Sequence, residues 1–196
     1  MTKEDLIKEI LEIGLQSDHR GNIYGEKYSN YLKSPGLWQC PEELAGLLIF
    51  LLDLEIKTFL NIGTYNGMTF NFISDVLNRK NKVDCITIDP VNYNPVMDSR
   101  FSYQSKTSDD YKNQEFDFVF IDGDHSYDWV KRDYDNVGYL AKYVCFHDIE
   151  DYYVRNADFK GGVPNFWEDI KKTRNHIEFI ESDKKDPKIM GIGLLI

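Results

Sequence analysis

Four titratable side chains follow two apolar segments of this sequence. Asp122 and His125 come after one segment, and His147 and Asp148 come directly after another. Histidine suits general acid–base catalysis because the pKa of imidazole lies near neutral pH, and a positioned base is typically worth about 10²- to 10⁴-fold in rate. A carboxylate at the end of an apolar strand is costly unless it has a function. We therefore predict that His125, His147 and Asp122 are catalytic.

Other roles for these side chains remain open. His125 could instead cap or orient the helix that follows it, and Asp124 is more typical of a solvated or capping residue. The oxygen and imidazole ligands of Asp122, Asp124, His147 and Asp148 could also bind Mg²⁺ or a similar hard cation. Asp122 and Asp148 are the metal ligands predicted for that case.

A glycine-containing turn and a strand-ending aspartate indicate a ligand site. Gly63 and Gly67 stand four positions apart at a junction between a strand and a helix, where the backbone can approach a ligand closely. Tyr65 occupies the second glycine position of the dinucleotide fingerprint, which argues against a nicotinamide enzyme. Asp89 ends the next strand before Pro90 and could accept hydrogen bonds from both hydroxyls of a ribose.

Strands and helices alternate from residue 58 onward, and several strands are apolar at consecutive positions. This pattern predicts an α/β fold with a doubly wound, mostly parallel seven-stranded sheet and a C-terminal antiparallel hairpin. Strands are expected at 58–62, 83–88, 101–104, 116–121, 143–146, 177–181 and 189–196, and helices at 3–13, 41–54, 68–77, 129–140 and 163–172. The connection 182–187 is expected to place one antiparallel strand at the sheet edge.

Residues 1–196 are expected to form a single domain whose first 37 residues supply an N-terminal helix and a surface loop or lid. Thr2 is the predicted N-cap of the helix, with Asp5 three positions on. Pro41 stands where the first residue of the second helix belongs. The N-terminal helix and the closing hairpin are the places where a homodimer could form.

Composition excludes several classes of partner. The formal net charge of −10 and the lack of a Lys or Arg run disfavour nucleic acid. The longest apolar run, 47–52, is too short to span a membrane, and the N-terminus lacks a secretory signal, so a cytoplasmic location is expected. Cys40, Cys85 and Cys145 form no paired motif and are expected to be buried, reduced thiols.

Taken together, the segments 120–127, 145–149 and 161–167 and the glycine turn resemble the class I S-adenosylmethionine-dependent methyltransferases. The sequence is most similar to a small bacterial group whose fourth strand ends in an Ile-Asp-Gly-x-His-x-Tyr signature. The likeness runs from about Trp38 to the C-terminus. It implies a Rossmann-like fold, S-adenosylmethionine as cofactor and transfer of its methyl group.

The resemblance also implies which residues hold the cofactor. Gly63, Thr64 and Gly67 would pass its methionine part, Asp89 would hold its ribose, and Ser105 with its neighbours would flank its adenine. The full set of cofactor contacts carried over is Gln39, Asn61, Gly63, Thr64, Gly67, Thr69, Asp89, Ser105 and Asp122. Asn61 is a departure, because the family usually has Glu or Asp there.

The leading hypothesis is an enzyme that methylates a hydroxyl group of a small molecule, such as a sugar or a glycan precursor. Some sugar and catechol O-methyltransferases with this fold use a metal, so Mg²⁺ is a second expected cofactor. Two alternatives remain: a cofactor-binding protein without catalysis, and a metal-dependent hydrolase built on Asp122, His125, His147 and Asp148.

Overall fold

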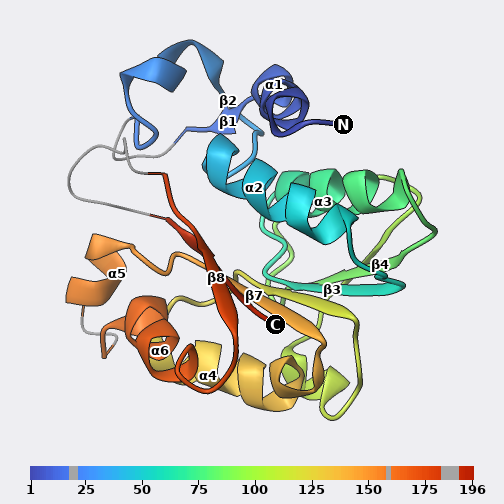
Figure 1. The fold of residues 1–196 in the computed structure, drawn as a ribbon, viewed down its shortest axis with the longest axis vertical. Coiled ribbons are helices and arrows are strands. Elements are labelled where there is room, and N and C mark those ends of the chain that lie inside the picture. Colours follow the sequence, from blue (N-terminus) through green and yellow to red (C-terminus); the bar gives the residue numbers. More distant parts are fainter. Residues whose placement is uncertain (18–21, 158–159, 182–189) are drawn as a thin grey trace.

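A seven-stranded β-sheet runs through the centre of the molecule (Figure 1). The computed structural model describes residues 1–17, 22–157, 160–181 and 190–196. The strands of the sheet are β3 (Thr58–Ile62), β4 (Asp84–Ile88), β5 (Ser102–Gln104), β6 (Phe118–Ile121), β7 (Tyr143–His147), β8 (His176–Phe179) and β9 (Ile192–Leu195). Each strand overlaps a segment that the sequence pattern predicts as a strand.

The strand order is β5-β4-β3-β6-β7-β9-β8, and β9 alone is antiparallel to its neighbours. The predicted doubly wound sheet with a C-terminal antiparallel hairpin is confirmed. The expectation that the antiparallel strand lies at the edge is wrong, because β9 lies between β7 and β8. All four residues of β9 are buried, whereas β8 alternates between exposed and half-buried residues, so β8 tolerates the edge better. The predicted connection 182–187 lies outside the described residues.

Helices cover both faces of the sheet (Figure 1). One face carries α2 (Pro41–Leu52) and α3 (Met68–Asn78), with α1 (Lys3–Ile13) packed on α2. The other face carries α4 (Tyr127–Asn136) and α6 (Gly162–Ile170), and the short α5 (Tyr152–Asn156) contacts α6. A separate apolar core fills each interface. Burial from both sides explains why β6 is apolar at every position.

The predicted helix starts are confirmed for the first two helices. Thr2 and Asp5 form a reciprocal capping box, in which each side chain accepts a hydrogen bond from the other residue's backbone N–H. Pro41 occupies the first turn of α2, where a missing N–H is harmless. The fourth predicted helix begins earlier than expected, at Tyr127, and a 3₁₀ turn over Gly138–Leu140 follows it.

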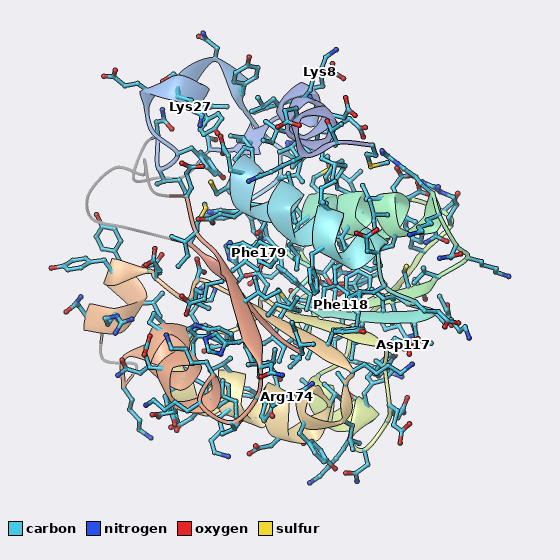
Figure 2. The ribbon with its side chains drawn as sticks, in the orientation of Figure 1. Lys8, Lys27, Asp117, Phe118, Arg174 and Phe179 are labelled. Carbon is cyan, nitrogen blue, oxygen red and sulfur yellow. The ribbon has the colours of Figure 1, made fainter. Side chains whose placement is uncertain are left out.

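Asp117 fixes the starting end of the sheet. Its carboxylate accepts hydrogen bonds from the backbone N–H groups of Lys57 (2.8 Å) and Thr58 (3.1 Å), which joins the beginnings of β3 and β6. The next residue, Phe118, points into the core and stacks on Phe59 with 4.9 Å between ring centroids (Figure 2). The carboxyl ends of the same strands lie at the opposite edge of the sheet, next to the polar side chains of the candidate site.

The segment after α1 is more ordered than the predicted irregular loop. It contains β1 (Leu15–Gln16), a 3₁₀ helix η1 (Glu26–Tyr31) and β2 (Leu32–Lys33), and β1 pairs with β2 in parallel. Tyr24 and Tyr28 are buried in the same core as α1 and α2. Large aromatic side chains therefore attach this segment to the body, a tertiary effect that overrides its polar composition.

The three cysteines are buried and form no disulfide, as predicted. No helix in the described ranges is both long enough and apolar enough to cross a bilayer.

Candidate active site

The glycine turn after β3 brings two strand ends into direct backbone contact. Gly63 has φ = 96°, and its N–H donates to the carbonyl of Ile88 at 2.9 Å. A Cβ at position 63 would lie 1.9 Å from the backbone oxygen of Asp122, so no larger residue fits there without rearrangement. The ends of β3, β4 and β6 therefore converge at this point, where the strand order reverses direction and α/β proteins bind ligands.

Asp89 holds the turn in shape. One carboxylate oxygen accepts from the backbone N–H groups of Thr64 (3.0 Å) and Tyr65 (3.2 Å), and the other accepts from Val91 N–H at 2.9 Å. Tyr65 has φ = 45°, a conformation that an L residue rarely adopts. Asp89 thus fixes the backbone conformation of the turn while facing the cavity beside it.

A cavity of about 530 Å³ opens at these strand ends, within the size range of ligand sites. Eight residues that the sequence singled out line it: Gly63, Thr64, Thr69, Asp89, Asp122, His125, His147 and Asp148. The structure therefore brings the glycine turn and Asp89 to one cavity with four titratable side chains, which we call the titratable cluster: Asp122, His125, His147 and Asp148.

Four predicted cofactor contacts do not line this cavity: Gln39, Asn61, Gly67 and Ser105. Asn61 is buried and donates to the carbonyl of Gly63 and to Thr87 Oγ1, both at 2.8 Å. Gly67 precedes α3 with φ = 84°, and a Cβ there would lie 2.7 Å from the carbonyl oxygen of Val96. Both residues support the conformation of the turn without lining the cavity.

Ser105 and Gln39 have other positions. Ser105 is exposed, and its three successors, Lys106, Thr107 and Ser108, form the cavity wall instead. Gln39 is fully buried, and its Nε2 donates to Asp122 Oδ2 at 3.0 Å. Gln39 thereby holds one oxygen of Asp122 and leaves Oδ1 facing the histidines.

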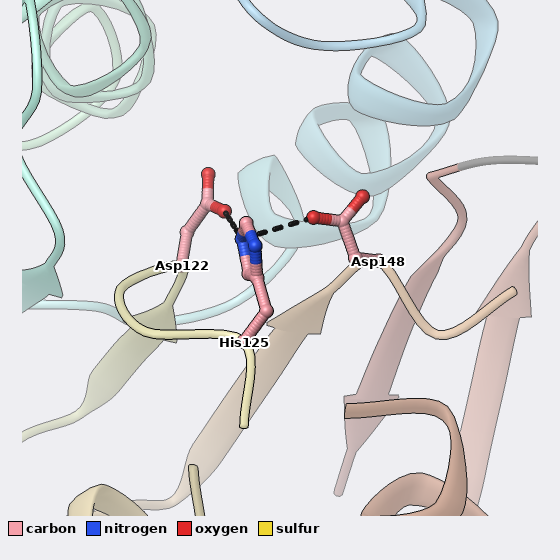
Figure 3. Close-up of side chains that lie close together, drawn as sticks. All are labelled: Asp122, His125 and Asp148. Atoms are coloured by element: carbon pink, nitrogen blue, oxygen red, sulfur yellow. Dashed lines mark ion pairs between the residues drawn. The ribbon is translucent and has the colours of Figure 1, made fainter. Parts of the chain in front are cut away.

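The titratable cluster spans the ends of β6 and β7 (Figure 3). His125 Nε2 lies 3.1 Å from Asp148 Oδ2 and 3.9 Å from Asp122 Oδ1. His147 Nδ1 lies 3.2 Å from Asp122 Oδ1 and 3.4 Å from Asp148 Oδ1. Each carboxylate is therefore shared between two imidazoles.

The two histidines differ in access to the cavity. The His147 side chain is 4% exposed, and neither ring nitrogen makes a hydrogen bond of good geometry to any described residue. The His125 side chain is 41% exposed. A buried imidazole without a full set of partners is unusual. Of the two rings, the more exposed His125 is the more accessible from the cavity.

The carboxylates raise the pKa values of both imidazoles. Burial alone would lower the pKa of His125, but Asp148 and Asp122 outweigh it and raise that pKa to about 9. The same balance raises the pKa of His147 well above its usual value. Burial would raise the pKa of Asp122, yet the His147 and His125 charges hold it below the ordinary value.

The capping alternative for His125 is not supported. α4 begins after Ser126 without a side-chain cap, and the His125 ring faces Asp148 instead. Asp124, in contrast, accepts from Ser126 N–H at 2.8 Å, which agrees with a turn-stabilising role. His176 is exposed, and His19 lies outside the described residues.

Asp122, His125 and Asp148 fit a divalent cation. One ligand atom from each lies within 4.8 Å of the others. Carboxylate oxygens suit Mg²⁺, whereas the imidazole nitrogen also admits Mn²⁺ or Zn²⁺.

Other cavity-lining residues were not predicted as site residues. Trp38 and Tyr65 meet edge to face at 5.4 Å, and Tyr65 meets Tyr93 in the same way at 5.5 Å. Tyr153 and Met190 also line the cavity, as does the buried Asp133. The sequence does show aromatic residues in these segments, but only tertiary structure reveals which of them reach the cavity.

Residues 60–149 match the model of a family described as a methyltransferase domain. This range contains the glycine turn, Asp89 and the titratable cluster. A comparison with curated proteins finds no match.

Solved structures with this fold are methyltransferases of several kinds. The O-methyltransferase from Bacillus cereus in complex with SAH aligns at 14% identity and a TM-score of 0.57, over 98% of this chain and 90% of that one. TomG, an O-methyltransferase of tomaymycin synthesis from Streptomyces achromogenes in complex with SAM, gives 15% identity, a TM-score of 0.55 and coverage of 98% and 89%. The N-methyltransferase NodS from Bradyrhizobium japonicum gives 12% identity, a TM-score of 0.54 and coverage of 76% and 92%.

The fold is therefore the Rossmann-like methyltransferase fold.

Proposed function

We propose that this protein transfers the methyl group of S-adenosylmethionine to a hydroxyl group of a small molecule, such as a sugar or a glycan precursor. The observation that carries the proposal is the convergence of the Gly63 turn, Asp89 and the Asp122–His125–His147–Asp148 cluster on one cavity. When bound, the cofactor supplies a methyl group made electrophilic by a sulfonium.

The chain fits this cofactor at the turn and at the end of β4. The missing side chain at Gly63 leaves the turn pressed against the Asp122 backbone, so the cavity floor is backbone and can be approached closely. Thr64 and Asp89 both line the cavity, and we assign the methionine and ribose parts of the cofactor to them. Asp89 Oδ1 retains acceptor capacity, because a carboxylate oxygen has two lone pairs and Oδ1 accepts only from Val91 N–H, whereas Oδ2 already accepts from two backbone N–H groups.

His125 is proposed as the base for the acceptor hydroxyl, acting in its neutral form, which in the metal-free protein becomes the main form only above about pH 9. Its ring is accessible from the cavity, and Asp148 lies 3.1 Å from Nε2 and can stabilise the imidazolium that forms when the hydroxyl proton arrives. His147 lies behind it and is positioned to hold Asp122 and Asp148 in place. Trp38, Tyr65 and Tyr153 provide aromatic surface for the acceptor and for a cationic sulfonium.

The proposal predicts that Asp89→Asn weakens binding of S-adenosylmethionine by about 10- to 100-fold, since hydrogen bonds to a charged group are worth about 1.5–3 kcal/mol. Isothermal titration calorimetry measures the affinity. Asp84→Asn is the matched control, because Asp84 is exposed at the other end of β4. Wild-type protein that binds no S-adenosylmethionine at high micromolar concentration would contradict the cofactor assignment. Binding without turnover across a panel of hydroxylated acceptors would favour a non-catalytic cofactor-binding protein.

In an alternative arrangement, His125 would be a ligand and not the base, and a divalent cation held by Asp122, Asp148 and His125 would itself polarise the acceptor hydroxyl. We expect Mg²⁺ or Mn²⁺ to raise the Tm of the chelator-treated protein, and we expect Asp148→Asn to abolish that rise. Asp128→Asn, at an exposed ion pair with Lys160, is the control. Equal shifts in wild type and Asp148→Asn would exclude this cluster as the metal site, and methyl transfer that is fully active in excess chelator would exclude a metal requirement.

A further inference from the structure

Residues 36–39, ahead of α2, form a segment at the cavity edge that we call the strap. The backbone of Leu37 pairs with the N-terminal segment, because its N–H donates to the Gly14 carbonyl at 2.9 Å and its carbonyl accepts from Gln16 N–H at 2.7 Å. Trp38 follows, is half-buried and lines the cavity. The strap therefore places one large aromatic side chain at the cavity edge.

Two amide side chains tie the strap to strand ends. Asn66, in the turn after β3, donates from Nδ2 to the Gly36 carbonyl at 2.9 Å. Gln39 donates from Nε2 to Asp122 Oδ2 at 3.0 Å, at the end of β6. One tie precedes Trp38 in the strap and the other follows it, so the place of this residue relative to both strand ends is fixed from two sides.

The strap packs closely against both of its neighbours. A Cβ at Gly36 would lie 2.7 Å from the backbone nitrogen of Gln16, so no side chain fits between the strap and β1 without rearrangement. The Trp38 ring meets the ring of Tyr65, the residue before Asn66, edge to face with 5.4 Å between centroids. The turn after β3 therefore contacts the strap twice, through a hydrogen bond and through an aromatic ring.

The start of α3 does not by itself require an amide at Asn66. Its Oδ1 accepts from Met68 N–H at 3.0 Å, a contact that a serine or aspartate oxygen could also make. Its Nδ2 faces the strap and donates to the Gly36 carbonyl and, at 3.2 Å, to Gln16 Oε1. Aspartate has no donor for these two acceptors, and the serine side chain is one atom shorter. The amide therefore serves the strap.

The two ties of the strap indicate which part of the proposed cofactor Trp38 would meet. The turn that contains Asn66 is assigned to the methionine part, and the cluster that contains Asp122 is the proposed place of methyl transfer. Trp38 lies between these ties, and the sulfonium joins the methionine part to the methyl group. A cation is attracted to an indole ring only when it lies within about 6 Å of the ring centroid, so the position of the ring matters.

Resting on the proposed cofactor, we infer that Asn66 is a positioning residue that holds the Trp38 ring against the sulfonium. Asn66 carries no charge, so it acts on the charged ligand through the strap. S-adenosylhomocysteine has a neutral thioether in place of the sulfonium. Trp38, held by Asn66, therefore raises the affinity for S-adenosylmethionine relative to S-adenosylhomocysteine, which favours replacement of the demethylated product by fresh donor.

Isothermal titration calorimetry of both ligands tests the inference in wild type, Trp38→Leu, Asn66→Ser and the double variant. Trp38→Leu should lower the ratio of S-adenosylmethionine affinity to S-adenosylhomocysteine affinity by about 2- to 30-fold, the range of a cation–π contact. Asn66→Ser should lower the ratio by part of that amount. The double variant should have the ratio of Trp38→Leu alone, because the two residues act as a unit. Trp38→Phe, which keeps an aromatic face, should retain part of the wild-type ratio.

Asn78→Ser is the matched control, because Asn78 makes the same kind of contacts at the other end of α3. Its Nδ2 donates to the Ser74 carbonyl at 2.9 Å, and its Oδ1 accepts from Val83 N–H at 3.0 Å. This variant should leave the ratio of the two affinities unchanged.

A wild-type ratio in Trp38→Leu or in Asn66→Ser overturns the inference, and so does an Asn66→Ser effect of equal size with and without the indole ring. An Asn66→Ser protein that binds both ligands less tightly by the same factor has only a structural defect, which overturns the inference as well. Wild type that binds neither ligand overturns the proposed cofactor instead, so the two failures are distinguishable.

Discussion

Shared carboxylates determine the protonation of the two active-site histidines. Asp148 is the largest charge acting on His125, and it adopts φ = 63°, a left-handed conformation that Asn also tolerates well. The backbone at this position turns the side chain toward both imidazoles. Replacing Asp148 with Asn should therefore remove the charge with little change in shape.

We expect the pKa of His125 in metal-free protein to lie near 9 and to fall toward 6.5 in Asp148→Asn. Loss of the nearby negative charge leaves burial, which disfavours the imidazolium, as the dominant influence. NMR titration of the imidazole resonances, assigned with a His125→Gln variant, measures this change. Asp124→Asn is the control, since that carboxylate contacts Ser126 N–H and not the His125 ring. A wild-type His125 that titrates near 6.5 would refute the proposed electrostatics.

At the scale of elements, the sequence predicts which polar residues lie at the strand ends. It does not predict which residues of the helices and loops form the walls of the cavity. Asp89, Asp122 and Asp148 each follow an apolar run, so local sequence places them at the carboxyl ends of β4, β6 and β7. Asp133 lies in the middle of an amphipathic helix, where an acid is ordinarily solvated. Only the packing of α4 against the turn at Ser108 buries it and turns it toward the cavity.

The two short N-terminal elements were missed for a related reason. β1 and β2 have two residues each, and their pairing joins positions about seventeen residues apart, which no local periodicity encodes. η1 is polar apart from its tyrosines, yet Tyr28 is buried. The segment is held by tertiary contacts and not by propensity.

The turn after β3 provides a matched pair of glycine tests. Gly63 and Gly25 have similar φ values of 96° and 91°, but a Cβ at Gly63 meets the Asp122 backbone whereas a Cβ at Gly25 meets nothing within 4 Å. We expect Gly25→Ala to cost only the conformational strain, about 1–2 kcal/mol. Gly63→Ala should cost several kcal/mol more and abolish measurable binding of S-adenosylmethionine. Urea unfolding and calorimetry measure the two effects, and equal destabilisation by both variants would show that the close approach of β3 and β6 is not essential.

At the scale of the whole molecule, the insertion of β9 between β7 and β8 completes the sheet and brings Met190 to the cavity. The sequence predicts a hairpin here but not its order in the sheet, because strand pairing is non-local. The buried carboxylate of Glu43 on α2 accepts from the backbone N–H groups of Glu181 (2.8 Å) and Gly191 (3.0 Å). Helix α2 thus holds the backbone just beyond β8 and just before β9. It links the N-terminal part of the chain to the last strand of the sheet.

Global stability should depend on pH through Asp133. Burial raises its pKa to about 6 from the ordinary aspartate value of about 3.9, so between these two pH values the folded state binds more protons at this group than the unfolded state does. Stability is therefore lost as pH rises from about 4 to 6, and at neutral pH the ionised carboxylate destabilises the fold by roughly 3 kcal/mol. Asp133→Asn removes this penalty while an amide oxygen can still accept the Ser108 hydrogen bond.

We accordingly expect Asp133→Asn to raise the Tm by about 6–12 °C at pH 7.5 and to leave it nearly unchanged at about pH 3.5, measured by differential scanning calorimetry without ligand. Asp135→Asn removes the same unit of charge from a protein of net charge −10 and controls for relief of general repulsion. If Asp133→Asn lowers the Tm at pH 7.5, the carboxylate supports the fold directly. If it raises the Tm by more than Asp135→Asn does, burial of the ionised Asp133 carboxylate costs the fold stability at neutral pH.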